Sequence, residues 1–386
     1  MNKDLSTLIS NLATSLPNLD DAQQSELTTS IQSLLSEAEL HQQTTWAAHM
    51  TPTVGSAALL GRLIAAAHNG NLLSADLYPK LAEIETQLIN WFCKLFHQQH
   101  GQFTHGSSYG NLEALWQARQ ECETSSNIVY GSVAAHYSIA KACNVLGLEY
   151  RAIPTNAIGQ IDTKALRIAC EQAQPLAIVA TAGTSSCGAI DPLIQCADIA
   201  NDLRCWFHID AAWGGSLALL EEQTELSGIE RADSLCFDPH KALGQPKPCS
   251  LLLYQRPLEP FIDVEADYLS QAPKNTIAGS YGGELFLSLW FSLLSNKNGL
   301  INDVRCRLEQ AQLFAQKLKK STDWTVWHSP TGIVCFMPSN ENTRLELEAI
   351  SIFSQAKINN QPVFRVVFTN ETTKADALIT ELAPYL

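Results

Sequence analysis

A lysine and an aspartate, each at the end of an apolar run, are the residues of this sequence best suited to cofactor chemistry. Lys241 follows the run SLCFDPH, and Asp210 ends the run CWFHID. A lysine amine forms a Schiff base with an aldehyde cofactor where burial or positive neighbours favour its neutral form, and the apolar strand and His240 could supply that setting. A buried carboxylate needs a partner. Asp210 therefore either pairs with a backbone or basic group as a structural element, or keeps a pyridine nitrogen protonated so that the ring becomes an electron sink.

Two further segments offer groups for a phosphate and for a flat ring. The segment GQFTHGSSYGNLEALWQAR places Ser107 and Ser108 at the start of an expected helix, where free N–H groups and hydroxyls form an anion site. Ordinary capping of the helix by serine is the alternative. His136 stands at an expected strand-to-helix junction in VAAHYSIAK, where its imidazole could stack on a cofactor ring. An isolated histidine is more often an incidental residue, so only the four elements together predict a cofactor site.

The elements that must position these residues are strands that alternate with helices between residues 127 and 254. The expected strands are NIVYGS (127–132), EYRAIPT (149–155), LAIVATAG (176–183), CWFHIDAAW (205–213), SLCFDPH (234–240) and CSLLLY (249–254). Such alternation predicts a mainly parallel α/β sheet. Ligands of these sheets bind beyond the carboxyl ends of the strands, where most of the candidate residues fall.

The chain is predicted to form three parts. Residues 1–45 carry apolar side chains at helical spacing and predict an amphipathic arm, which either covers its own subunit or clasps a second one. Residues 46–285 form the large domain. Residues 286–386 begin with a long helical stretch, followed by strand-like WTVWHS, GIVCFMP and VFRVVFTN, and predict a small α+β C-terminal domain.

The composition argues against several classes of partner. The chain has 386 residues, of which 46% are hydrophobic, and can bury a large core. Its 39 acidic and 25 basic residues give a net charge of −14, which argues against nucleic acid and anionic lipid and favours a small molecule. The eleven cysteines include no C-x-x-C pair, as expected of free thiols in a reducing compartment. With no signal-peptide pattern and no apolar run of eighteen residues, the sequence predicts a soluble, cytoplasmic protein with no membrane segment.

In their order and spacing, the four elements resemble the group II pyridoxal-phosphate-dependent amino-acid decarboxylases, which include glutamate, aromatic amino-acid and histidine decarboxylases. The resemblance runs from about residue 50 to 300 and resumes in FRVVFTNETT. It implies transferase fold type I, with a mainly parallel seven-stranded sheet in the large domain and a small α+β C-terminal domain. It also implies pyridoxal 5′-phosphate as the cofactor, no metal, and a homodimer, since sites of this fold are usually completed by the neighbouring subunit.

Two family motifs assign roles around the lysine and the aspartate. The pattern of aspartate or serine, one residue, then His-Lys matches DPHK, which implies Lys241 as the Schiff-base lysine and His240 as a neighbour of the phosphate. The pattern His-x-Asp-Ala-Ala matches residues 208–212. That match implies Asp210 on the pyridine nitrogen and Ala212 beneath the ring.

Two further motifs match, with departures. His136 matches the ring-stacking histidine, and ATAGTSSCGAIDP resembles the family segment ATAGTT-x-x-GAIDP, which implies that Thr184 lies close to the cofactor. The phosphate turn of the family usually reads Thr-x-Gly-Gly-Ser/Thr-x-x-Asn, whereas THGSSYGN has Ser107 in place of the second glycine. This serine adds a side chain beside the expected phosphate. Tyr281 stands where relatives commonly carry arginine.

The resemblance implies decarboxylation of an L-amino acid to an amine and CO2, with Lys241, Tyr268 and His136 as catalytic residues. Tyr268 in VEADYLSQ matches the tyrosine of the family's mobile catalytic loop. A phenol with a pKa of about 10 stays protonated and can return a proton to the α-carbon, whereas family members with phenylalanine there tend toward oxidative aldehyde formation. The alternative is that Tyr268 packs a loop against a partner subunit. Arg365 in FRVVFTN matches an arginine that could bind a substrate carboxylate, or it forms a surface salt bridge.

The features that bear on the substrate conflict. HIDAAWGG resembles glutamate, cysteine-sulfinate and 2,4-diaminobutyrate decarboxylases, whereas the short loop DYLSQAPKNTIAGS and the abbreviated C-terminal domain resemble bacterial histidine and plant serine decarboxylases. We expect a small polar amino acid, namely 2,4-diaminobutyrate, glutamate, aspartate or histidine. The alternatives are another pyridoxal-phosphate-dependent lyase of the same fold, such as a carbon–carbon lyase or a desulfurase, and a non-catalytic relative.

Overall fold

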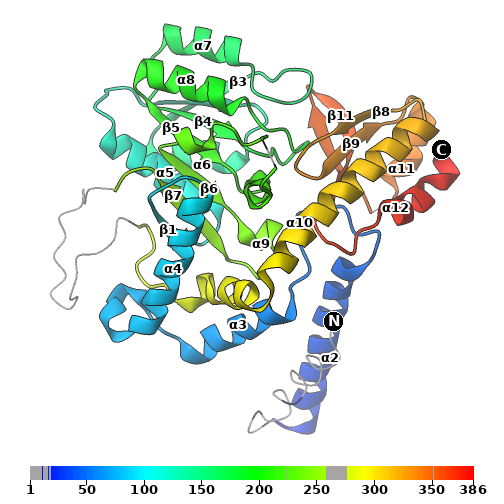
Figure 1. Cartoon of the computed structure of the whole chain (residues 1–386). Helices are drawn as coiled ribbons and strands as arrows, with labels where there is room; N and C mark the ends of the chain where they lie inside the picture. The colour runs from blue at the N-terminus through cyan, green and yellow to red at the C-terminus, as the bar shows by residue number, and fades with distance from the viewer. Residues whose placement is uncertain (1–10, 12–15, 17–18, 223, 258–275, 351) are drawn as a thin grey trace.

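Two sheets of unequal size organise the molecule (Figure 1). The computed structural model describes residues 11, 16, 19–222, 224–257, 276–350 and 352–386. Within them, a seven-stranded sheet forms the large α/β body, and a four-stranded antiparallel sheet with its helices forms a smaller unit beside it. The predicted fold class, a mainly parallel seven-stranded sheet with a small α+β C-terminal part, is confirmed.

The large sheet has the strand order β1-β7-β6-β5-β4-β2-β3. Strands β2 to β6 pair in parallel, and β7 runs antiparallel to both of its neighbours, β6 and β1. The strands are β1 (His100–Thr104), β2 (Ile128–Ser132), β3 (Glu149–Ile153), β4 (Ala177–Thr181), β5 (Trp206–Asp210), β6 (Ser234–Phe237) and β7 (Ser250–Tyr254). Strands β4 to β7 are buried along their whole length, which explains their continuous apolar runs.

All six strands expected between residues 127 and 254 are present. Strand β1 was not expected, because its sequence HGQFT contains one large apolar residue, Phe103, and only its last two residues are buried. It is held in the sheet by backbone pairing with β7 rather than by an apolar pattern.

Helices cover both faces of the large sheet (Figure 1). They are α4 (Pro79–Leu95), α5 (Ser107–Glu121), α6 (Tyr137–Leu146), α7 (Thr163–Gln172), α8 (Leu193–Leu203) and the short α9 (Pro239–Ala242). Successive strand residues point to opposite faces. Ala177 and Val179 therefore pack with residues of α5 and α6, whereas Ile178 and Ala180 pack with residues of α4, α7 and α8.

The long helix α10 (Leu287–Ser321) connects the large body to the small unit (Figure 1). Its backbone leaves helical geometry at Asn296, and its second half packs Phe314 and Leu318 against the small sheet. That sheet has the order β10-β11-β9-β8, with β8 (Thr325–His328), β9 (Ile333–Met337), β10 (Ser354–Ile358) and β11 (Gln361–Val367), and helices α11 (Glu341–Glu348) and α12 (Ala375–Leu382) accompany it. The predicted long helix is confirmed, while the domain boundaries at 45/46 and 285/286 stay predictions.

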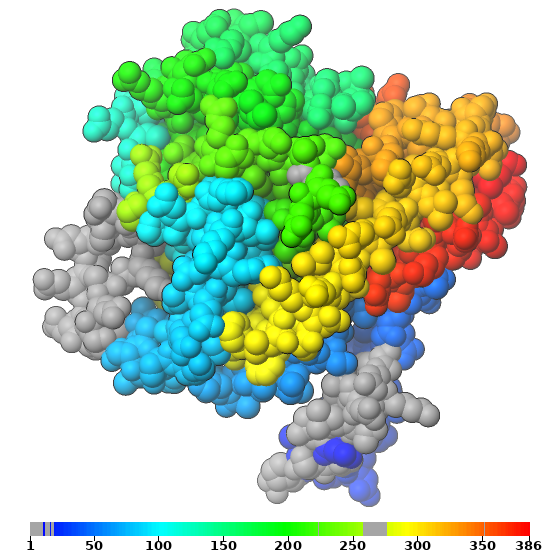
Figure 2. Space-filling view, viewed as in Figure 1, coloured from blue at the N-terminus to red at the C-terminus, as the bar shows by residue number. Residues whose placement is uncertain are grey.

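Helix α2 (Asp21–Glu39) projects away from the rest of the chain (Figures 1 and 2). Asp20 caps its first turn, and none of its residues is buried. Helix α3 (Ser56–His68) follows and packs against α10. Short 3-10 helices complete the elements: η1 (Leu40–Gln42), η2 (Leu72–Leu77), η3 (Gly214–Leu219), η4 (Ile229–Arg231), η5 (Gly283–Leu285) and η6 (Ala383–Tyr385). Among the described residues, none of the helices has both the length and the apolar character needed to cross a membrane.

Candidate active site

A cavity of about 460 Å³ lies where β4, β5 and β6 end and α5 and α6 begin. This is the edge of the sheet at which ligands bind in open α/β folds. Of the residues singled out in the sequence, the following line it: Ser107, Ser108, His136, Asp210, Ala212, His240 and Lys241. The structure thus brings together side chains from four separate segments of the chain.

Lys241 lies on α9, the single helical turn that follows β6. Its Nζ is 3.0 Å from Oδ2 of Asp238, which is the N-cap residue of the same turn. Burial alone would lower the pKa of Lys241, but the carboxylates of Asp238 and Asp210 together raise it above its usual value. The expectation that this setting favours the neutral amine was therefore wrong for the free lysine, because two carboxylates stabilise its ammonium form.

Asp238 is the centre of the polar contacts on this side of the cavity. Its Oδ1 accepts hydrogen bonds from the backbone N–H of Ser107 at 3.1 Å, from the Ser107 hydroxyl at 2.7 Å and from the hydroxyl of Ser250. Burial alone would raise the pKa of Asp238, but Lys241, His240 and these hydroxyls lower it below its usual value. Asp238 is therefore a buried, ionised carboxylate beside Lys241. No role was predicted for Asp238 from the sequence, although it lies in the motif DPHK.

Asp210 ends β5 and is held by two donors. Its Oδ2 accepts from Nδ2 of Asn111 at 3.0 Å, and its Oδ1 accepts from the backbone N–H of Ala212 at 3.2 Å. Asn111 is fully buried on α5, and the same amide nitrogen donates to Oγ of Ser138 at 2.9 Å. The carboxylate of Asp210 is thus fixed in direction while it lines the cavity, as a partner for a pyridine nitrogen requires.

His208, two residues before Asp210 on β5, completes this network as a neutral imidazole. Burial lowers its pKa to about 4, although Asp210 opposes the shift. Because Nδ2 of Asn111 donates elsewhere, its Oδ1 is the acceptor for Nε2 of His208 at 2.9 Å. On the other side, Ser234 Oγ accepts from Nε1 of Trp206 and donates to Nδ1 of His208 at 2.8 Å. His208 and Asn111 both lie in motifs recognised in the sequence, but no role was predicted for either residue.

His136 caps the start of α6 and lines the cavity. Its Nδ1 accepts from the backbone N–H of Ser138 at 3.3 Å, so the Ser138 hydroxyl, 2.8 Å away, donates to the same nitrogen. Burial is the largest influence on His136 and lowers its pKa, with Asp210 opposing and Lys241 reinforcing the shift. The neutral, half-buried ring is suited to stacking against a flat ligand.

The expected phosphate turn lies at the N-terminus of the fifteen-residue helix α5. Gly106 has a positive φ of 109°, which a glycine adopts without strain and which turns the chain into the helix. Ser107 is buried with both of its donors on Asp238, whereas Ser108 is exposed to the cavity. His240 also lines the cavity, with its Nδ1 donating to the carbonyl of Cys249 at 2.8 Å. Ser108, rather than Ser107, therefore has its hydroxyl available to an anion there.

Thr184 does not line the cavity. It is fully buried in the turn after β4, where its Oγ1 accepts from the backbone N–H of Ala189 at 3.1 Å. Its neighbours Gly183 and Ser185 do line the cavity, so Ser185 is a site residue that the sequence analysis missed. The cofactor role of Thr184 stays a prediction, and these contacts do not support it.

Arg365 lies on β11 and forms no salt bridge with the described residues, while its predicted role in binding a substrate carboxylate stays a prediction. Its Nε donates to Oγ of Ser354 at 2.8 Å, and its Nη atoms donate to the backbone carbonyls of Ser185 and Ala48, the latter at 3.1 Å. It does not line the cavity. Because Ser185 does, Arg365 instead ties the small unit to one wall of the site.

The two tyrosines singled out in the sequence lie elsewhere. Tyr281 is buried and donates its phenol hydrogen bond to Oε2 of Glu85 at 3.3 Å, and it does not line the cavity. Tyr268 lies outside the described residues, so its role stays a prediction.

These groups fit pyridoxal 5′-phosphate. The cavity offers a lysine amine for the aldehyde, an oriented carboxylate for the pyridine nitrogen, a neutral imidazole for the ring face, and a helix N-terminus with a free hydroxyl for the phosphate. In the described part of the chain, no group of three or more His, Cys, Asp or Glu side chains is placed to hold a metal ion.

Comparison with known proteins agrees with this site. The family model described as the pyridoxal-dependent decarboxylase conserved domain matches residues 11–338. The chain is 36% identical to an L-2,4-diaminobutyrate decarboxylase of Rhizobium meliloti (strain 1021), over 53% of this chain and 44% of that protein. It is 30% identical to a tryptophan decarboxylase of Camptotheca acuminata, over 75% of this chain and 66% of that protein. The chain thus spans less than two thirds of the length of these two relatives.

A solved structure shows the same fold. The crystal structure of Catharanthus roseus tryptophan decarboxylase in complex with L-tryptophan superposes with a TM-score of 0.82 at 23% identity, covering 99% of this chain and 96% of that one. The family model covers well over half of the chain and includes every described residue that lines the cavity. The chain therefore belongs to the pyridoxal-dependent decarboxylase family.

Proposed function

We propose that this protein decarboxylates an L-amino acid to the corresponding amine and CO2, with pyridoxal 5′-phosphate bound to Lys241 as a Schiff base. The observation that carries this proposal is the convergence of Lys241, Asp210 and His136 on one cavity at the N-terminus of α5. Family membership agrees with it.

Each residue has a task that follows from its surroundings. The cofactor supplies an electron sink for the bond that breaks at the α-carbon. Asp210, fixed by Asn111, holds a proton on the ring nitrogen, and Ala212 leaves room for the ring. His136 covers a ring face. Asp238, 3.0 Å from Lys241, holds the end of the lysine side chain in the cavity, where it would meet the aldehyde.

The remaining groups bind the phosphate and orient the substrate. Ser108 and the N-terminus of α5 hold the phosphate, with His240 beside it. We assign proton return to the α-carbon to Tyr268. Replacing it, Tyr268→Phe, should shift the product from amine toward an aldehyde formed with O2, as measured by chromatography of both products. Amine production at the wild-type rate would contradict this assignment.

The substrate we propose is a small polar L-amino acid: 2,4-diaminobutyrate, glutamate, aspartate or histidine. The two similar proteins named above act on amino acids as different as diaminobutyrate and tryptophan, so similarity alone does not choose among them. Among the described residues that line the cavity there is no cysteine, which argues against the desulfurase alternative.

The test is an assay of CO2 release across the twenty common L-amino acids and 2,4-diaminobutyrate, with the amine identified by mass spectrometry. We expect one or a few small polar amino acids to give CO2 and amine in equal amounts. The variant Lys241→Ala, loaded with the same cofactor, should lose at least a thousandfold in rate. Release of an aldehyde or a sulfide instead of CO2 would support another lyase reaction, and no product from any amino acid would contradict the proposal.

We also propose a homodimer located in the cytoplasm. Leu34 of α2 is 65% exposed and no residue of this helix is buried, which supports a second subunit as the surface that covers it. All eleven cysteines are free thiols, and most of them are buried, which agrees with a reducing compartment.

A further inference from the structure

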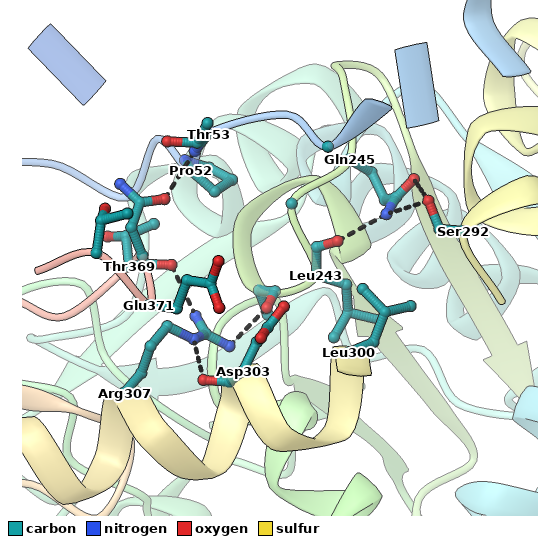
Figure 3. Close-up of a pocket in the computed structure, with 15 residues that line it drawn as sticks. Pro52, Thr53, Leu243, Gln245, Ser292, Leu300, Asp303, Arg307, Thr369 and Glu371 are labelled. Carbon is teal, nitrogen blue, oxygen red and sulfur yellow. Dashed lines mark hydrogen bonds between the residues drawn. The ribbon is translucent and has the colours of Figure 1, made fainter. Parts of the chain in front are cut away.

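A second, smaller cavity of about 180 Å³ lies behind the helix that carries Lys241 (Figure 3). Four segments line it: residues 52–55, residues 242–245 after the lysine, the part of α10 from residue 292 to 307, and residues 369–372 after β11. Arg307 of α10 lines one side of the cavity and extends toward residues 242–245 and residues 369–372 (Figure 3). The cavity therefore marks the junction of the large body, the long helix and the small unit.

Arg307 joins α10, the residues after the lysine and the residues after β11 through hydrogen bonds. Only 4% of it is exposed. Its Nη2 donates to the carbonyl of Ala242 at 2.6 Å, its Nη1 to the carbonyl of Thr369 at 3.1 Å, and its Nε to the carbonyl of Asp303 at 3.2 Å (Figure 3). One planar side chain thus fixes the distance between the lysine helix and the small unit.

The bond to Ala242 bears directly on the lysine. Ala242 follows Lys241 and is the last residue of α9, a helix of four residues. The final carbonyls of any helix lack partners within it, and a cation at that end is favourable. So short a helix has little stability of its own. Its orientation, and with it the direction of the Lys241 side chain, depends on such outside contacts.

Arg307 also contacts a second wall of the cofactor cavity. Its guanidinium carbon lies 6.0 Å from the ring of Trp213, which lines that cavity and follows the Asp210-Ala-Ala segment. An arginine over a tryptophan face is a favourable contact. Arg307 therefore touches both the lysine side and the aspartate side of the site from behind, without reaching the site itself.

A buried guanidinium is costly, and a methionine or leucine would fill the same space more cheaply. Burial lowers the pKa of Arg307 to about 10, a shift that Asp303 opposes in part. The group remains charged at neutral pH. An apolar side chain could not form the directional hydrogen bonds that Arg307 makes to carbonyl groups in three segments.

We propose that Arg307 is a positioning residue that holds the Lys241 helix and the Trp213 wall in the geometry that captures pyridoxal 5′-phosphate. The inference rests on the proposed function, because it takes Lys241 as the residue that binds the cofactor. It predicts that loss of Arg307 weakens cofactor capture more than it weakens the fold.

The experiment compares purified wild-type protein with Arg307→Met, Arg307→Lys and the control Arg305→Met. Arg305 lies on the same helix and is exposed, and within the described part of the chain its one hydrogen bond is to Asn302 at 2.9 Å. Pyridoxal 5′-phosphate is titrated into each protein, and its dissociation constant is taken from the visible absorption band. The ratio of visible circular dichroism to absorbance reports the orientation of the bound cofactor, and a thermal scan reports folding.

We expect at least a tenfold weaker dissociation constant and an altered dichroism ratio for Arg307→Met. Arg307→Lys should lie between it and wild type, because an ammonium group keeps the charge but cannot span the carbonyls of Ala242 and Thr369 with a planar fork. Arg305→Met should stay within twofold of wild type. If Arg307→Met does not fold, Arg307→Lys decides, with at least a threefold loss expected.

Each other outcome has a distinct meaning. Folded Arg307 variants with wild-type affinity and dichroism ratio would overturn the inference while leaving the proposed function intact. A variant that loses absorbance and thermal stability in proportion, with an unchanged dichroism ratio, would show that Arg307 serves the fold alone and would also overturn it. A wild-type protein that forms no visible band would instead contradict the proposed function.

Discussion

At the scale of single residues, the site depends on a buried polar network around Asn111. Its amide holds Asp210 and Ser138 with one nitrogen and accepts from His208 with its oxygen. Each member has a partner, which is the condition under which buried polar groups can fix a geometry. The network joins the carboxylate for the ring nitrogen to His136, the residue expected on the ring face.

Replacing Asn111 with leucine, which has a similar volume and no polar atoms, should loosen Asp210. We expect the variant to bind pyridoxal 5′-phosphate at least tenfold more weakly and to lose about 2 to 4 kcal/mol of unfolding free energy, because three buried partners are left unsatisfied. The measurements are a cofactor titration and denaturant unfolding. The control Asn144→Leu changes an exposed residue of α6 and should leave both quantities nearly unchanged. Equal behaviour of the two variants would contradict the role given to Asn111.

The lowered pKa of His208 predicts a pH dependence of stability. Its folded pKa of about 4 lies below the usual value of 6.5, so between these values the unfolded chain binds more protons than the folded one. Stability from the neutral His208 is therefore present above pH 6.5 and is lost as the pH falls toward 4. We expect wild type to lose about 2 kcal/mol more than His208→Gln between pH 7 and pH 5. Parallel pH profiles of the two proteins in urea unfolding would contradict this.

Much of the residue-scale site could be predicted from the sequence, and the exceptions share a cause. Lys241, Asp210 and His136 follow strands whose ends must meet at one edge of a sheet, so their proximity follows from the fold. The fold alone does not determine which residue of a turn faces the cavity. In the turn after β4, Ser185 lines the cavity and Thr184 is buried. Local backbone geometry determines this difference, and the periodicity of the sequence does not predict it.

At the scale of elements, helices α3 and α10 pack closely against each other at Gly61. A Cβ at Gly61 would lie 2.5 Å from the carbonyl oxygen of Leu287 and 2.6 Å from Cα of Ser288. The glycine thus lets two helix backbones approach more closely than any side chain would permit. This contact fixes the first turns of α10, before the break at Asn296, whereas Arg307 lies after that break.

Gly61→Ala should push α3 away from α10. The atoms that a methyl group would meet belong to the backbone and cannot rotate away, so we expect a loss of about 1 to 3 kcal/mol in unfolding free energy. Urea unfolding measures it. The control Gly55→Ser lies at the N-cap of the same helix, where nothing is within 4 Å of a Cβ and serine is a favoured cap, so its stability should not fall. An unchanged unfolding free energy for Gly61→Ala would show that α3 and α10 can move apart without loss of stability.

Strands that form continuous apolar runs could be predicted from the sequence, whereas strands that are held mainly by pairing with a neighbouring strand could not. Strands β4 to β7 are buried throughout and were recognised as apolar runs. Strands β1 and β10 were missed, since β1 buries only its last two residues and β10 only its last one, and each is held by an antiparallel neighbour. Such strands depend on contacts distant in sequence, which a local pattern does not contain.

At the scale of the whole molecule, the arm formed by α2 is the feature that points beyond a single chain. It projects from the body (Figure 1), and none of its residues is buried. We expect light scattering after gel filtration to give twice the chain mass of 42.3 kDa. Leu34→Glu should shift the population toward monomer at low micromolar concentration, and the neighbouring exposed control Gln32→Glu should not. A wild-type protein that elutes as a monomer would contradict the proposed homodimer.

The central claim is that Lys241 binds the cofactor, and chemical trapping tests it most directly. Wild-type protein is incubated with pyridoxal 5′-phosphate, reduced with borohydride and digested, and the modified peptide is identified by mass spectrometry. We predict a visible absorption band before reduction and a single phosphopyridoxyl group on Lys241 afterwards. A protein that stays colourless with added cofactor, or a label carried by another lysine, would contradict the claim.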